Sequence, residues 1–66
     1  MNLKQMEYFV AAAEQLNFTR AAKKCFISQT AMTLQIQSLE EKIGVPLFVR
    51  DKHHVELTAA GKVYLN

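Results

Sequence analysis

The clearest periodic pattern of the chain runs from Ser28 to Gly44. Apolar side chains recur there at i, i+4, i+7 and i+11, which is the spacing of one face of an α-helix. Ser28 is a favourable N-cap residue, and Gly44 suits the position just after a helix. The pattern therefore predicts one amphipathic helix over residues 28–43, with an apolar stripe made of Met32, Ile36, Leu39 and Ile43.

The face of this helix opposite the stripe carries short hydroxyl and amide groups. At about 100° per residue, four residues fall together on that side, and Gln29 flanks them near the N-terminus. Such side chains can read base edges in a DNA major groove, but an ordinary solvated face has the same pattern. The helix alone leaves both interpretations open for Gln29, Thr30, Thr33, Leu34 and Gln37.

A first core helix is predicted from Leu3 to about Leu16 by the same rule. Its polar residues, Gln5 among them, lie on the solvent side of the pattern. We expect the other face to be buried, and the apolar positions that share it are Leu3, Met6, Phe9, Val10, Ala13 and Leu16.

A short second helix is predicted from Phe18 to Cys25, with Asn17 as its N-cap. Its apolar positions again repeat at helical spacing, and they include two alanines that permit close helix approach. Cys25 belongs to this stripe, so we expect an inert core thiol rather than a redox sensor.

The polar side of the second helix carries cations and no acids, which favours phosphate contacts from Thr19, Arg20 and Lys23. Only Phe26 and Ile27 separate this helix from the Ser28 cap. The spacing is that of a helix-turn-helix, in which a short turn presents a recognition helix. Glycine is common in such turns, and this turn has none.

After Gly44 the pattern changes from helical to alternating. Residues 47–49 and 55–57 are two short β-prone runs around a polar, cationic tip, which predicts a two-stranded wing over 47–57. Arg50, Lys52, His53 and His54 are candidates for contacts to phosphates or to a minor groove, although a merely soluble loop is an open alternative. Thr58 is expected to cap a last helix that continues to Asn66.

Composition limits the classes of protein to which the chain can belong, but it does not identify a function. Sixty-six residues make one small domain, and a net charge of +2 is too small to establish nucleic-acid binding. There is one cysteine, no zinc-ligand spacing, no signal peptide and no membrane-spanning stretch, so we expect a soluble, cytoplasmic protein. Cys25, His53 and His54 form no catalytic or metal constellation. We therefore expect neither an enzyme nor a cofactor.

Several separated motifs stand in a specific order along the chain. They are LKQMEYF at 3–9, FTRAA at 18–22, ISQ at 27–29, Leu39-Glu40, GVPLF at 44–48 with Arg50, and LTAAG at 57–61. Through them, essentially the whole chain resembles the N-terminal DNA-binding domain of LysR-type transcriptional regulators. The resemblance implies a mainly α fold with a small two-stranded β-wing, a winged helix-turn-helix of order helix, helix, helix, strand, strand, helix.

The resemblance also implies sequence-specific binding of double-stranded DNA. Helix 28–43 then enters the major groove, and wing 47–57 rests on the flanking backbone or the minor groove. Thr30, Leu34 and Gln37 depart from residues frequent in the family and leave this helix poor in cations. Base reading is therefore expected from neutral groups, with a bias towards A·T pairs, by Gln29, Thr30, Thr33, Leu34 and Gln37. Phosphate contacts are expected from Thr19, Arg20, Lys23, Ser28, Arg50, Lys52 and His53.

The resemblance divides the chain into a DNA-binding domain, 1–57, and the start of a linker helix, 58–66. We expect the chain to be a fragment of a longer regulator, which forms a homodimer or a higher oligomer and binds a small-molecule effector in a C-terminal domain absent here. The short apolar segment 63–65 offers little area for a stable dimer, so a monomeric fragment stays open. The alternative function is a helix-turn-helix module that binds an acidic protein.

Overall fold

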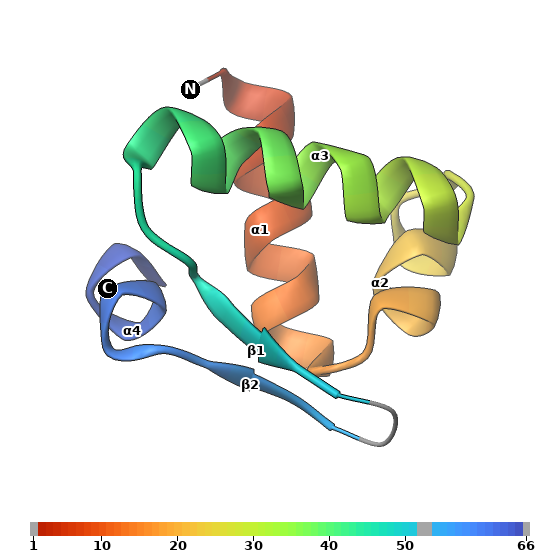
Figure 1. Ribbon diagram of the computed structural model, residues 1–66. Helices are drawn as coiled ribbons and strands as arrows, with labels where there is room; N and C mark the ends of the chain where they lie inside the picture. Colours follow the sequence, from red (N-terminus) through yellow and green to blue (C-terminus); the bar gives the residue numbers. More distant parts are fainter. Residues whose placement is uncertain (1, 52–53, 66) are drawn as a thin grey trace.

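The structure is a computed structural model that describes residues 2–51 and 54–65. Its elements follow the predicted order, with helices, a hairpin and a final helix (Figure 1). Their bounds are α1 Leu3–Gln15, α2 Phe18–Lys24, α3 Gln29–Ile43, β1 Phe48–Arg50, β2 Val55–Leu57 and α4 Ala59–Leu65.

Side-chain oxygens cap the beginnings of the helices, as the sequence predicts for α2, α3 and α4. The Asn17 Oδ1 accepts a hydrogen bond from the Arg20 amide at 2.9 Å, and the Ser28 Oγ accepts one from the Ala31 amide at 3.0 Å. The Thr58 Oγ1 accepts a bond from the Gly61 amide at 3.0 Å. Each bond satisfies an N–H group that has no partner within its helix, so these caps determine where the helices begin.

The helices lie across one another, and the hairpin closes the open side (Figure 1). α3 crosses α1, α2 packs at the N-terminal end of α3, and α4 lies at the opposite end of the molecule. β1 and β2 form an antiparallel pair in which Phe48 faces Leu57 and Arg50 faces Val55. The predicted wing is confirmed, and its first residue, Leu47, precedes β1 and is fully buried.

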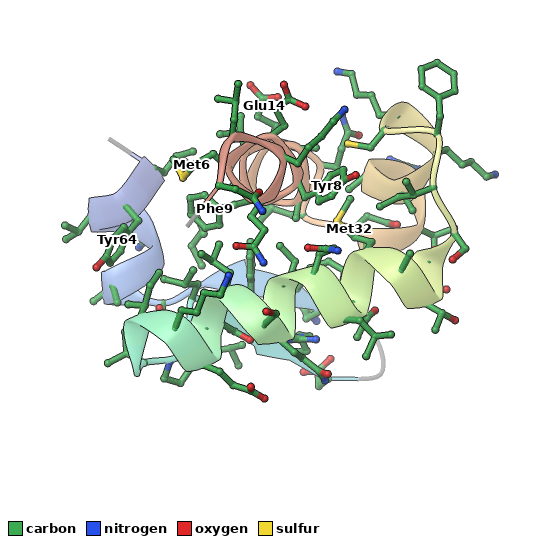
Figure 2. All side chains as sticks on the ribbon, turned by 90° about the horizontal axis from the view of Figure 1, so that it is seen from above. Met6, Tyr8, Phe9, Glu14, Met32 and Tyr64 are labelled. Carbon is green, nitrogen blue, oxygen red and sulfur yellow. The ribbon has the colours of Figure 1, made fainter. Side chains whose placement is uncertain are left out.

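The core lies between α1, α2, α3 and the start of the wing. Phe9 of α1 and Met32 of α3 point into the space between these helices, whereas Glu14 lies on the side of α1 away from α3 (Figure 2). Phe48 of β1 packs against two aromatic rings, with centroid distances of 5.7 Å to Phe9 and 5.4 Å to Phe18. The wing is therefore part of the core and not an appended hairpin.

Three predictions for α1 and its end are wrong. Leu3 is 78% exposed because it stands at the free N-terminal end of α1. Leu16 is 46% exposed because the helix stops at Gln15 and Leu16 turns into the left-handed region with φ 47°. Gln5, expected on the solvent side, is only 4% exposed.

Gln5 is buried because α3 crosses α1 at this position. Its side-chain nitrogen lies 3.4 Å from the Gln35 Oε1 and 3.4 Å from the Ser38 Oγ, and its Oε1 lies 3.4 Å from the Lys42 Nζ. These partners satisfy the amide, which would otherwise make its burial costly. α1 and α3 thus meet through a polar contact as well as through their apolar stripes.

The other predicted stripes are largely confirmed. Met32, Ile36 and Leu39 are buried, and Ile43 packs against the core from a half-buried position. α2 ends at Lys24, one residue earlier than predicted, so Cys25 is a half-buried C-cap next to the core. Among the described helices, none has the length and apolar character needed to span a membrane.

Candidate nucleic-acid interface

A polar groove of about 390 Å³ lies where the start of α2, the first turns of α3 and the wing meet. It is lined by Asn17, the N-cap of α2, by Thr19 of α2, by Gln29 and Thr33 of α3, and by Arg50 of β1. These residues come from three elements that are up to 33 positions apart in the sequence, so only the fold brings them together. The full lining consists of Leu16, Asn17, Phe18, Thr19, Gln29, Thr33, Arg50, Asp51, His54 and Val55.

The polar face of α3 is open to solvent, as its periodicity predicts. Leu34 is 58% exposed, which leaves an apolar contact surface among amides and hydroxyls. Gln29, Thr30 and Gln37 are exposed, and Thr33 is half-buried at the groove. The five residues predicted to read bases therefore share one accessible face of α3.

Gln37 lies at a second depression, beside the C-terminal end of α3. This depression has a volume of about 590 Å³ and is bordered by Glu40, Glu41 and residues 44–46. Two of its lining carboxylates belong to α3, whereas the α2 and α3 residues that line the first groove are neutral. The two depressions place neutral polar groups at the N-terminal end of α3 and negative groups at its C-terminal end.

The cations of α2 are exposed, but they do not line the groove. Arg20 and Lys23 are both exposed, and Thr19 reaches the groove itself. Ser28 is exposed too, but its hydroxyl oxygen already accepts the Ala31 amide as the N-cap of α3. The predicted phosphate-contacting groups of α2 and its following turn thus remain accessible.

Arg50 is held from two sides, which its place in the sequence does not reveal. Its Nη2 donates to the Glu40 Oε1 at 2.9 Å, and its guanidinium carbon lies 4.8 Å from the centre of the Phe18 ring. The side chain keeps 28% exposure and lines the groove. Of the other predicted wing contacts, Lys52 and His53 lie outside the described residues.

Two polar lining residues, Asn17 and Asp51, were not predicted as contacts from the sequence, whereas His54 was predicted as a wing-tip candidate and does line the groove. The His54 amide donates to the Asp51 Oδ1 at 2.7 Å, and the Asp51 amide donates to the His54 carbonyl at 3.0 Å. Aspartate favours such local bonds in turns, which is the one sequence signal that marks this corner. Among residues 2–51 and 54–65, no three His, Cys, Asp or Glu side chains group as metal ligands.

The chain matches a protein-family model over residues 3–62, and that family is described as "Bacterial regulatory helix-turn-helix protein, lysR family". It is similar to the Hca operon transcriptional activator HcaR of Escherichia coli (strain K12), with 55% identity over 65 residues, 98% of this chain and 22% of HcaR. It is also similar to the regulator AlsR of Bacillus subtilis (strain 168), with 47% identity over 66 residues, 100% of this chain and 22% of AlsR.

Two solved structures have the same fold as this chain and superimpose on it closely. The crystal structure of a CbnR_DBD–DNA complex superimposes with a TM-score of 0.95 at 45% identity, covering 98% of this chain and 75% of that one. The crystal structure of a BenM_DBD complex with catB site 1 DNA superimposes with a TM-score of 0.94 at 40% identity, covering 98% of this chain and 72% of that one. The chain therefore belongs to the lysR family of bacterial regulatory helix-turn-helix proteins and corresponds to the DNA-binding domain of these regulators.

Proposed function

We propose that this chain binds one half-site of double-stranded DNA, with α3 in the major groove and the wing on the flanking backbone or the minor groove. An α-helix fits the width of the major groove and can present the side chains of one face to base edges. The exposed face of α3 carries the required mixture of amide, hydroxyl and apolar groups. The opposite face of α3 is buried in the core.

The observation that carries this proposal is the convergence of three elements on one groove. Thr19, Thr33 and Arg50 were selected separately as candidate contacts, and all three line it. A DNA strand that follows such a groove meets α2, α3 and the wing in turn, which is how backbone contacts orient a recognition helix. The likeness to structures of DNA complexes supports the same arrangement.

Base reading is assigned to neutral groups of α3. Gln29 and Gln37 have amides suited to the N6 and N7 atoms of adenine, while Thr33 and Thr30 have hydroxyls that accept or donate with several bases. Leu34 supplies an exposed apolar surface for a thymine methyl group. We therefore infer half-sites in which A·T pairs predominate at the contacted positions.

Phosphate contacts are assigned to the groups that surround this face. On α2 these groups are Thr19, Arg20 and Lys23, and at the start of α3 the contact is assigned to Ser28. In the wing, a phosphate contact is assigned to Arg50, which lines the groove. The sequence-based proposal also includes Lys52 and His53 of the wing tip.

The test is selection of binding sites from random duplexes, followed by titration of the selected and an unrelated duplex at several salt concentrations. We expect the logarithm of the binding constant to fall linearly with the logarithm of salt, by about 0.9 per neutralised phosphate. Selected sites with mostly G·C pairs at the contacted positions would contradict the assigned base readout. Absence of salt-dependent duplex binding would instead favour a module that binds an acidic protein.

The chain spans 22% of the length of the two relatives named above. For the longer protein we propose transcription regulation in the cytoplasm, where bacterial DNA lies, as a homodimer or higher oligomer with an effector site in a further domain. Residues 1–57 are then the DNA-binding unit, and residues 58–66 begin a linker helix. The 66-residue chain alone is proposed to be monomeric, which sedimentation equilibrium tests directly.

A further inference from the structure

Glu40 connects the recognition helix to the start of the wing through a single carboxylate. Its Oε2 accepts the Leu47 amide at 2.7 Å and the Phe48 amide at 3.2 Å. Its Oε1 accepts the Arg50 guanidinium at 2.9 Å. The Glu40 side chain is 14% exposed, so these bonds form where water competes weakly and charge-assisted bonds are strong.

The same contact extends to α2 through Arg50. The Arg50 guanidinium lies over the Phe18 ring at 4.8 Å while its other side borders the groove. An arginine held between a carboxylate and an aromatic face loses most of its side-chain freedom before any ligand arrives. Glu40 therefore determines both where the wing begins relative to α3 and where the Arg50 charge stands.

A carboxylate at this place has two opposite effects on DNA. By charge alone it repels phosphates, so its removal would strengthen binding. By position it holds a cation and a strand against the recognition helix, so its removal would weaken binding. Because the two effects have opposite signs, one substitution distinguishes them.

We propose that Glu40 is a positioning residue for DNA binding, which presents Arg50 to a phosphate and fixes the spacing between α3 and the wing. The proposal rests on the DNA-binding function proposed above. Glu40 itself need not touch DNA. Its contribution passes through the bonds to Leu47, Phe48 and Arg50.

The test compares Glu40→Gln with Glu41→Gln in the 66-residue chain. Both variants remove one negative charge from the same turn of α3, but Glu41 is an exposed neighbour. A glutamine at position 40 must turn its NH₂ group either to the backbone amides or to Arg50, so one set of bonds is lost. The binding constant for the selected duplex is measured at several salt concentrations. The temperature is chosen so that the circular dichroism spectra show both variants to be folded.

For Glu40→Gln we expect about tenfold weaker binding, equal to about 1.4 kcal/mol, and a salt slope lower by about one phosphate. Glu41→Gln is expected to bind as tightly as the wild type or slightly more tightly, with an unchanged slope. Equal behaviour of the two variants, or tighter binding by Glu40→Gln, overturns the proposal. A role in folding alone would lower stability without changing the salt slope.

Arg50→Met provides a second measurement that remains decisive if Glu40→Gln does not fold. It leaves Glu40 free to hold the Leu47 and Phe48 amides and removes only the positioned cation. We expect the same loss of about one phosphate in the salt slope, and an unchanged slope would overturn the proposal. If the wild-type chain itself shows no salt-dependent duplex binding, the proposed function fails rather than this role of Glu40.

Discussion

At the scale of single residues, Phe26 has an uncommon backbone conformation in the turn between α2 and α3. Its φ of 60° lies in the left-handed region, and its side chain is 95% exposed. The Phe26 and Ile27 amides close the turn on the carbonyls of Lys23 and Ala22 at 3.2 and 3.0 Å. A non-glycine residue in this conformation costs about 1 to 2 kcal/mol, and the exposed Phe26 side chain makes little packing contact that could offset the cost.

Phe26→Gly is therefore expected to stabilise the protein by about 0.5 to 1 kcal/mol, because relief of the strain exceeds the extra freedom of glycine in the unfolded chain. Thermal and urea unfolding measure the change. Phe26→Ala is the matched control, since it removes the ring but keeps the left-handed cost, and its stability should stay near that of the wild type. A fall in stability for both variants would mean that the ring contributes packing.

At the scale of elements, α4 is attached to the wing through a very close backbone approach. The Thr58 amide donates to the Leu47 carbonyl at 3.0 Å, and the Thr58 hydroxyl donates to the Pro46 carbonyl at 2.8 Å. A Cβ added at Gly61 would lie 2.3 Å from the Leu47 carbonyl oxygen and 2.8 Å from the Leu57 Cδ2. The absence of a side chain at this position is what lets α4 lie against the segment that enters β1.

Gly61→Ala is expected to destabilise the protein by about 1 to 3 kcal/mol, because the obstructing atom belongs to the backbone and cannot rotate away. Alanine favours helices more than glycine does, so propensity alone predicts the opposite sign. Chemical denaturation gives the free energy of unfolding. Lys62→Ala, at an exposed neighbouring position, should change it by no more than about 0.5 kcal/mol.

At the scale of the whole molecule, one aromatic cluster joins the helices to the hairpin. Phe48 of β1 contacts Phe9 of α1 and Phe18 of α2, and Leu47 beside it is fully buried. A domain of 66 residues has a total stability of about 3 to 10 kcal/mol. A large part of it depends on this cluster, so we expect the helices and the wing to unfold together.

Phe48→Ala should cost about 3 to 5 kcal/mol and leave much of the chain unfolded at 25 °C. Phe48→Leu conserves more volume and should cost less than about 1.5 kcal/mol. The helical circular dichroism and the amide resonances of β1 and β2 are then expected to disappear at the same urea concentration in Phe48→Leu. Helices that persist after the strand signals have gone would show that the wing is an independent unit.

The extent of successful prediction differs between the elements and the site. The caps at Asn17, Ser28 and Gly44 were predictable, because each depends on the conformation of only a few neighbouring residues. The open face of α3 was predictable for the same reason, since helical periodicity places its residues together. The errors at Leu3 and Leu16 arise because periodicity does not show that these residues stand at the exposed ends of α1, and the error at Gln5 arises because periodicity does not show where α3 crosses α1.

The candidate contacts show this difference most clearly at Arg50. Its sequence position predicts an exposed cation in a wing, whereas the structure gives it a carboxylate from α3 and a ring from α2. That Asp51 and His54 line the same groove as Asn17 also depends on how the hairpin packs on the helices. No local pattern contains these partners.

Local signals along the chain thus suffice for the order of elements, the N-caps of α2, α3 and α4, the buried stripe of α3 and the family. Each follows from interactions that reach only a turn or two along the backbone, or from motifs in a fixed order. The groove, the burial of Gln5 and the three bonds of Glu40 depended on the tertiary structure. They arise where α1 crosses α3 and where the wing closes on both, and the geometry of such crossings is set by the packing of distant side chains.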